Sequence, residues 1–353
     1  MEEWKEYKYK DLFKWNSGKP FIKEGTQYPV YGSNGVIGYS DTFNYSNRII
    51  LGRVGAYCGS VNYYPDKFYA TDNTLITECD ETKIVYPYAF YMLGTSKLNS
   101  FAGGAAQPLI TQSILKHLKC YLPSLPTQQK IASILSAYDN LIQNYKKQIE
   151  ALQTAASELY KEWFVRFRFP GWQNAKFENG IPKGWKVEKL TKLVEVKYGK
   201  DHSKLDDGNI PVYGSGGIMR YCNKALYDKE TVLIPRKGSL NNIMYANRPL
   251  WTVDTMFYSI MLRKNIAKYL YYVLSKIDME SFNAGAALPS MTTEILSHFK
   301  IIVPDNEILE SFDKKIALIF TQIDNLQQQI TNLTQQRDLL LPRLMSGKLE
   351  VKK

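Results

Sequence analysis

The sequence predicts an α+β fold with two similar mixed α/β domains, separated by a pair of long antiparallel coiled-coil helices in a pseudo-two-fold internal repeat. Three observations predict it. The chain repeats itself once, each repeat begins with segments of strand composition, and each repeat ends in a long heptad pattern. We therefore expect domains at residues 1–123 and 173–304, followed by helical regions at 124–172 and 305–353.

The internal repeat appears when the sequence is aligned with itself. Matching segments keep one order in both halves, which predicts that the halves fold alike. The clearest matches are Pro-Val-Tyr-Gly-Ser at 29–33 and 211–215, Arg-x-Gly at 53–55 and 236–238, Gly-Ala-Ala at 104–106 and 285–287, and Asp-Asn-Leu at 139–141 and 324–326. The Gly-Ala-Ala segments predict irregular loops.

The first part of each repeat has the composition of short strands joined by glycine turns. Arg-Ile-Ile-Leu at 48–51 and Thr-Val-Leu-Ile at 231–234 are examples, rich in the β-branched residues that strands prefer. Prolines at 123–126 and at Pro304 end these parts, and the periodicity then changes to that of a helix.

Apolar residues in the second part recur at alternating spacings of four and three, the pattern of a coiled coil. One stripe runs from Ile131 to Trp163 and the other from Leu309 to Leu344. Because one chain holds two such stripes, we expect the helices to pack on each other, and the repeat implies that they are antiparallel. The alternative is two separate helical bundles. The stripe positions assigned to the coiled coil include Ile131, Leu135, Ile142, Ile149, Leu159, Ile316, Ile323, Ile330 and Leu340.

Composition indicates a polyanionic partner. The net charge is +11, from 45 Lys and Arg against 34 Asp and Glu, and both halves of the chain are basic. The four cysteines form no Cys-x-x-Cys pair, so neither a zinc site nor a disulfide framework is expected. The first residues are too polar for a signal peptide, and no apolar run reaches the roughly 20 residues of a membrane span. We expect a cytoplasmic protein.

The sequence offers little support for catalysis or for a metal site. It contains neither the Asn-Pro-Pro-aromatic or Asp-Pro-Pro-Tyr tetrapeptide of amine methyltransferases nor a P-loop. Asp66, Glu81 and Lys83 superficially fit a metal-dependent nuclease, but the second repeat does not keep them. His117 and His298 occupy equivalent positions within apolar runs and are expected to be framework residues. We expect no catalytic residue and no metal ligand in this chain.

The Tyr-Gly-Ser turns and Arg-x-Gly loops are the candidates for DNA contact. Glycine lets a backbone approach a ligand closely. Arginine donates bidentate hydrogen bonds to guanine or holds phosphate, and asparagine reads adenine. The alternative is that the glycines serve only tight turns and the arginines pair with carboxylates. The candidate residues are Tyr31, Ser33, Asn34, Arg53, Tyr213, Ser215, Arg236, Lys237 and Asn241.

Four segments resemble the specificity subunit of type I restriction-modification systems, and the resemblance covers essentially the whole chain. The segment at 122–132 resembles the family's Pro-x-x-x-Gln-x-x-Ile-Ala start of the first helix, and 158–164 the end of that helix. The second domain opens on Ile-Pro-Lys-Gly-Trp at 181–185, and the chain ends in Leu-Leu…Ser-Gly-Lys at 339–348. The second helix departs from the family in lacking the paired glutamines.

The resemblance implies a DNA-recognition subunit without catalysis, in which each domain reads one half of a bipartite target in double-stranded DNA. Two methyltransferase (modification) subunits would dock on the helices, near Gln128 and Gln129 and along the stripe, and restriction/translocase subunits would join. S-adenosylmethionine, ATP and Mg would belong to those partners, with no cofactor in this chain. The alternatives are a stand-alone metal-dependent DNA nuclease and a purely structural coiled-coil adaptor.

Overall fold

The protein is described by a computed structural model covering residues 4–21, 24–103, 108–283 and 289–351, in two compact units. Unit 1 comprises Met1–Lys146 and Gln327–Lys353, and unit 2 comprises Lys147–Leu326. Both long helices, α3 (Leu125–Tyr160) and α6 (Asn306–Met345), contribute residues to both units. Both Gly-Ala-Ala segments predicted as loops lie outside the described residues.

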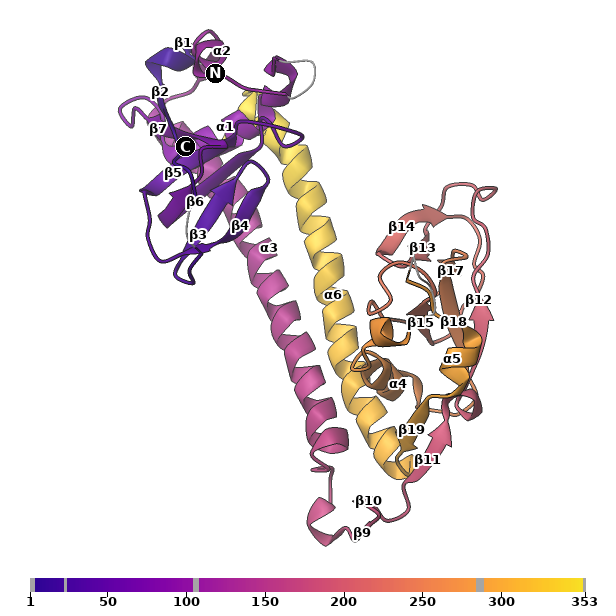
Figure 1. Ribbon diagram of the computed structural model, residues 1–353. Coiled ribbons are helices and arrows are strands. Elements are labelled where there is room, and N and C mark those ends of the chain that lie inside the picture. Colours follow the sequence, from indigo (N-terminus) through magenta and orange to yellow (C-terminus); the bar gives the residue numbers. More distant parts are fainter. Residues whose placement is uncertain (1–3, 22–23, 104–107, 284–288, 352–353) are drawn as a thin grey trace. The chain divides into compact units, whose positions relative to one another are not determined.

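Unit 1 is built on a six-stranded sheet with strand order β2-β7-β5-β6-β3-β4 (Figure 1). All neighbouring strands are antiparallel except β3 and β6, which are parallel. A separate two-stranded sheet pairs β1 with β8. The elements are β1 (Lys5–Lys8), β2 (Phe13–Ser17), β3 (Tyr28–Gly32), β4 (Gly35–Ser40), β5 (Tyr45–Gly52), β6 (Val61–Ala70), β7 (Thr74–Cys79), α1 (Tyr86–Thr95), α2 (Gln112–Lys116) and β8 (Lys119–Leu122).

Unit 2 repeats this plan with its strands in two sheets, ordered β12-β18-β15-β16 and β14-β13-β17. The β11–β19 pair corresponds to β1–β8. The elements are β9 (Phe177–Glu178), β10 (Ile181–Pro182), β11 (Lys186–Lys189), β12 (Val194–Tyr198), β13 (Ile210–Gly214), β14 (Gly217–Cys222), β15 (Thr231–Pro235), β16 (Met244–Ala246), β17 (Trp251–Thr252), β18 (Met256–Met261), α4 (Ala267–Leu274), α5 (Thr293–Ser297) and β19 (Lys300–Val303).

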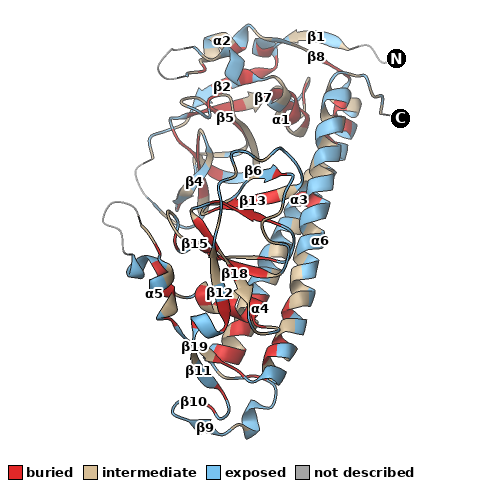
Figure 2. Cartoon of the chain, turned by 90° about the vertical axis from the view of Figure 1, so that its right-hand side faces the viewer, coloured by how far each residue is buried: buried red, intermediate tan, exposed pale blue. Residues whose placement is uncertain are grey.

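The central strands carry continuous apolar runs because both of their faces are covered. Every residue of β15 is buried, and so is the run at 49–52 in β5. In Figure 2, β13 and β15 are largely buried, whereas much of α6 is exposed. A close backbone approach is also repeated. A Cβ at Gly18 would lie 2.0 Å from the carbonyl oxygen of Thr71, and one at Gly199 would lie 2.0 Å from that of Val253.

In unit 1 the beginning of α3 packs against the end of α6. Ile131, Leu135 and Leu344 belong to one buried cluster with the core of unit 1. Asp139 ties three elements together. Its carboxylate is 2.5 Å from Nη1 of Arg337 on α6, and it accepts a 2.6 Å hydrogen bond from the Tyr91 hydroxyl on α1. These side chains are partly shielded from water, and their hydrogen bonds connect α1 to both long helices.

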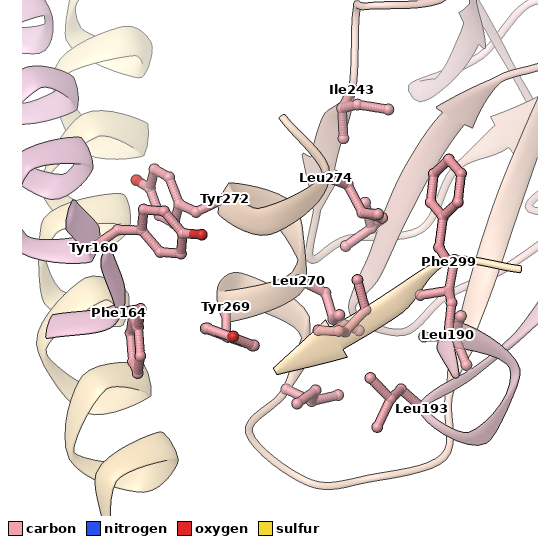
Figure 3. Packing of buried hydrophobic residues seen from close by; sticks show 14 of the residues in the cluster. Tyr160, Phe164, Leu190, Leu193, Ile243, Tyr269, Leu270, Tyr272, Leu274 and Phe299 are labelled. Atoms are coloured by element: carbon pink, nitrogen blue, oxygen red, sulfur yellow. The ribbon is translucent and has the colours of Figure 1, made fainter. Parts of the chain in front are cut away.

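In unit 2 the end of α3 packs against the beginning of α6. Tyr160 at the end of α3 and Phe164 in the π-helical turn Lys161–Val165 that follows it face Tyr269 and Tyr272 of α4 (Figure 3). The Phe164 ring also meets Phe312 of α6 edge to face, with centroids 4.8 Å apart. Since early α3 meets late α6 in one unit and late α3 meets early α6 in the other, the helices are antiparallel. The predicted fold class is confirmed, and the alternative of two separate helical bundles is wrong.

A buried lysine anchors α4 to α6. Lys268 Nζ lies 2.6 Å from the Glu230 carboxylate and 2.9 Å from that of Asp313. Burial lowers the pKa of Lys268, but the hydrogen bonds from its ammonium to the two carboxylates outweigh burial and raise the pKa above its usual value. The ammonium therefore stays charged at neutral pH, and the pairing holds the second domain to its helix.

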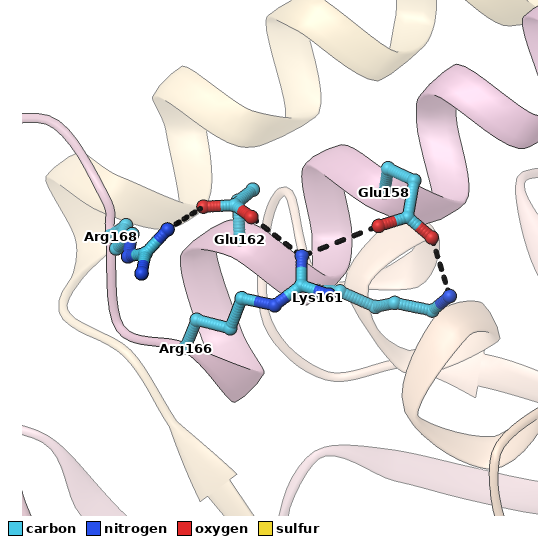
Figure 4. Close-up of polar contacts among 5 residues, drawn as sticks. All are labelled: Glu158, Lys161, Glu162, Arg166 and Arg168. Carbon is cyan, nitrogen blue, oxygen red and sulfur yellow. Dashed lines mark hydrogen bonds and ion pairs between the residues drawn. The ribbon is translucent and has the colours of Figure 1, made fainter.

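The end of α3 carries a cluster of exposed ion pairs (Figure 4). Arg166 bridges Glu158 and Glu162 at 3.3 and 2.5 Å, and Lys161 pairs with Glu158 at 2.5 Å. Arg168 lies 3.5 Å from Glu162. Solvent screens such pairs, so each of them contributes little to stability. No helix among the described residues is long and apolar enough to cross a membrane.

Candidate nucleic-acid interface

In unit 2, the Tyr-Gly-Ser segment at the end of β13 and the Arg-x-Gly loop after β15 form one corner. The Asn242 side-chain amide donates a 2.8 Å hydrogen bond to the Ser215 carbonyl. A Cβ at Gly238 would lie 2.8 Å from the Ser215 hydroxyl, and Gly238 has a positive φ of 82°. Glycine is therefore required where the loop crosses the turn. We call residues 213–217 with 236–242 the arginine corner of unit 2.

Unit 1 brings the equivalent turn and loop together. The Val54 amide donates to the Ser33 hydroxyl at 3.3 Å, and the Ser60 hydroxyl donates to the Ser33 carbonyl at 2.6 Å. The Asn73 carbonyl accepts from both the Ser33 hydroxyl and the Arg53 amide, at 2.7 and 2.9 Å. Residues 31–35 with 53–60 form the arginine corner of unit 1.

The two arginines have the same backbone ties. Arg53 donates from its amide to Asn73 and accepts at its carbonyl from Ile110, at 2.9 and 3.0 Å. Arg236 donates to the Thr255 carbonyl and accepts from the Met291 amide, both at 2.8 Å. Each arginine is thus fixed at its backbone on both sides.

Neither arginine pairs with a carboxylate in the part of the chain that the structure describes. Across the described residues, neither guanidinium has a carboxylate oxygen within 4.0 Å. The Arg236 side chain donates to the backbone carbonyl of Asp254 at 3.1 Å. The alternative interpretation, pairing with carboxylates, therefore does not describe these arginines, and both remain available to an anionic or guanine partner.

The other candidate residues divide by exposure. Tyr31 and Tyr213 are buried, at 8 and 7% exposure, so they support the corners from inside and do not present a face to bases. Burial raises the pKa of Tyr31 to about 12. Ser33 and Ser215 are half-buried at the turns, and Asn34 is exposed.

Asn241 is a structural residue. Its amide donates to the Asp278 carboxylate at 3.1 Å, and its carbonyl accepts from the Met279 amide at 2.7 Å. The expectation that Asn241 reads adenine is therefore not supported, because the amide nitrogen and the amide oxygen of its side chain are both hydrogen-bonded to residues 278–279. Lys237 is half-buried and forms an isolated bridge with Ser290.

The nuclease alternative finds no support. Lys83 donates to Asp80 at 2.7 Å and to the Asp11 carbonyl at 3.1 Å, so its ammonium is used structurally. Within the described ranges, no three His, Cys, Asp or Glu side chains are grouped to hold a metal ion. His117 and His298 are exposed C-caps of α2 and α5, and His298 Nδ1 lies 2.8 Å from the Glu294 carbonyl.

The helix residues assigned from the heptads face the packed side of their helices. Ile131, Leu135, Ile142, Ile316 and Ile330 are buried, while Ile149, Leu159, Ile323 and Leu340 are partly buried.

Gln128, expected at a partner-docking surface, is fully buried instead. Its carbonyl accepts from the Val85 amide at 3.1 Å, and its amide donates to the carbonyls of Lys83 and Pro123 at 2.9 and 3.0 Å. Gln128 therefore fastens the start of α3 to its own domain, whereas Gln129 is exposed.

Replacing Gln128 by leucine is expected to destabilise unit 1. The change keeps the volume but leaves one buried amide and two carbonyls unsatisfied, at about 1–3 kcal/mol for each such group. Thermal unfolding of the full chain measures the loss, and Gln129→Leu is the matched control. Equal melting temperatures for the two variants would contradict the assignment.

The comparisons with known proteins identify the family of the chain. A family model described as "Type I restriction modification DNA specificity domain" matches residues 1–154 and 182–339. The type I restriction enzyme MjaIX specificity subunit of Methanocaldococcus jannaschii is 27% identical over 312 residues, covering 76% of this chain and 70% of the relative. The EcoprrI specificity subunit of Escherichia coli is 35% identical over 120 residues, covering 34% of this chain and 30% of the relative.

A solved structure shares the fold. The crystal structure of a type I restriction-modification S subunit from M. genitalium superposes with a TM-score of 0.69 at 21% identity, covering 99% of this chain and 97% of that one. The chain belongs to the family of type I restriction-modification DNA specificity domains. It is a DNA-recognition subunit of such a system and not a catalytic one.

Proposed function

We propose that each unit reads one half of a bipartite target in double-stranded DNA through its arginine corner. The observation that carries the proposal is that the corner occurs twice, with the same backbone ties around Arg53 and Arg236. Arginine is the side chain that most often reads guanine in the major groove, through two parallel hydrogen bonds. Two short half-sites add their discrimination, since each mismatch costs about 1–3 kcal/mol.

We further propose that α3 and α6 act as spacer and as docking surface for two methyltransferase subunits, which restriction/translocase subunits join. Apolar side chains outside the packed stripe support this role. In unit 1, Ile134 and Leu141 lie one heptad apart on α3 and Leu339 lies on α6, with exposures of 36, 37 and 72%. Leu318 is 72% exposed in unit 2. Such side chains on a long helix suit a partner helix.

In this proposal S-adenosylmethionine, ATP and Mg serve the partner subunits, and the complex works in the cytoplasm where it meets DNA. The chain itself contributes recognition. Its basic charge of +11 adds a sequence-independent attraction to phosphate.

Arg236→Ala and Arg53→Ala form a matched pair that tests the proposal. Each complex, assembled with its methyltransferase, is offered a degenerate DNA library, and methylated sites are sequenced. We expect each variant to lose discrimination at a guanine of one half-motif, by about 10- to 100-fold, because a bidentate contact to a base is lost. The other half-motif should remain unchanged. If either variant altered both half-motifs, or neither, the proposal of two independent readers would be wrong.

A further inference from the structure

The Arg236 guanidinium lies over an aromatic ring that is not among the candidate residues for DNA contact. The Arg236 guanidinium carbon lies 5.2 Å from the centre of the Tyr198 ring, at the end of β12. The Tyr198 ring in turn meets Phe257 edge to face, with centroids 5.0 Å apart. Tyr198 is nevertheless 51% exposed, although a large aromatic at a strand end would gain by burial.

Unit 1 has no such ring at the equivalent position. Tyr198 pairs with Phe257 across β12 and β18, and Ser17 pairs with Leu75 across β2 and β7. In the internal repeat, Ser17 therefore stands where unit 2 has Tyr198. The backbone hydrogen bonds of Arg53 and Arg236 are alike. The two corners therefore differ in whether an aromatic ring lies beside the guanidinium.

We propose that Tyr198 is a positioning residue for DNA recognition, which holds the Arg236 guanidinium in the orientation that reads guanine. The proposal rests on the proposed function of the corner. An arginine side chain has several rotatable bonds, and fixing it in advance removes the loss of freedom that binding would otherwise impose. The ring attracts the guanidinium electrostatically from one face, while the Asp254 carbonyl fixes one nitrogen.

Because only Arg236 has such a ring beside it, we expect the two half-sites to be read with unequal discrimination. A guanidinium held in place loses more when the base is wrong, because it cannot turn to another acceptor without leaving the ring. We expect discrimination at the guanine read by Arg236 to depend on Tyr198.

The test uses Tyr198→Leu and Tyr198→Phe in the complex with the methyltransferase, with methylation of a degenerate library as the readout. Tyr198→Leu should reduce discrimination at one guanine by about fivefold, the factor expected for an exposed cation–π contact. Tyr198→Phe keeps the ring and should keep discrimination at that guanine at the level of the parent. The other half-motif should not change, and the melting temperature of each variant shows that the chain is folded.

A double substitution separates positioning from direct contact. Arg236→Lys keeps the charge but lacks the planar fork, so adding Tyr198→Leu to it should have no further effect on discrimination. An equal further loss in that background would show that Tyr198 contacts DNA itself and would overturn the proposal. If Arg236→Lys lowered discrimination while Tyr198→Leu alone did not, the positioning role would be wrong and the function of the corner would stand. If Arg236→Lys had no effect, the corner itself would not be the reader.

Discussion

Replacing Phe312 by alanine is expected to destabilise unit 2 by about 3–5 kcal/mol, the usual effect of removing a buried phenylalanine. Phe312 is fully buried, and its ring meets both Trp163 and Phe164 in the turn that follows α3, with centroids 5.8 and 4.8 Å apart. The substitution opens a cavity where α3, α4 and α6 meet. Hydrogen-exchange mass spectrometry of the full chain should show faster exchange in β15 and α4.

Leu318→Ala is the control on the same helix. Leu318 is 72% exposed, and truncating it should change stability by less than about 0.5 kcal/mol. Similar exchange for both variants would contradict the packing described for unit 2. Uniform loss of protection in both units after Phe312→Ala would show that they unfold together.

A matched insertion of seven residues in each long helix is expected to lengthen the spacer of the DNA target by roughly three base pairs. One heptad adds about 10 Å at 1.5 Å per residue, and DNA rises about 3.4 Å per base pair. The insertions belong after Lys146 in α3 and after Leu326 in α6, where each helix passes from one unit to the other. Seven residues keep the stripe in phase, so the helix pair should still form.

The measurement is methylation of a library in which both half-motifs are constant and the spacer varies. The half-motifs preferred by the variant should be those of the parent, because neither arginine corner changes. An insertion in α3 alone breaks the register between the helices and should abolish activity. If the matched variant kept the parent spacer, something other than α3 and α6 would set the distance.

The helices and the repeat could be predicted from sequence because both are local, periodic signals. The heptad stripe of the first helix extends further than its apolar residues indicate. Continued three residues before Ile131, it falls on Gln128, which is buried in line with Ile131 and Leu135. The polar character of Gln128 hid this position, because a buried amide is identified only by the backbone groups that it satisfies.

The side-chain contacts within the arginine corners could not be predicted from the sequence. Adjacent glycine turns predicted close backbone approach, but nothing local showed that the Asn241 side chain would be used by Asp278 and Met279. Tyr198 and Arg236 are brought together by strand pairing between β12, β18 and β15. Such contacts depend on register over long sequence distances, and composition does not encode them.

The division of the two long helices between the units has a consequence for synthesis of the protein. Unit 2 is a continuous stretch, so all of its residues are added to the growing chain before Gln327. Unit 1 is interrupted, and Leu344, which is 2% exposed in its core cluster, is added only after the whole of unit 2. A nascent chain therefore carries a first unit whose core stays open until the second half of α6 has been added, although the domain made first usually folds first. Chains that terminate early would expose that core, including Ile131 and Leu135, to chaperones and proteases.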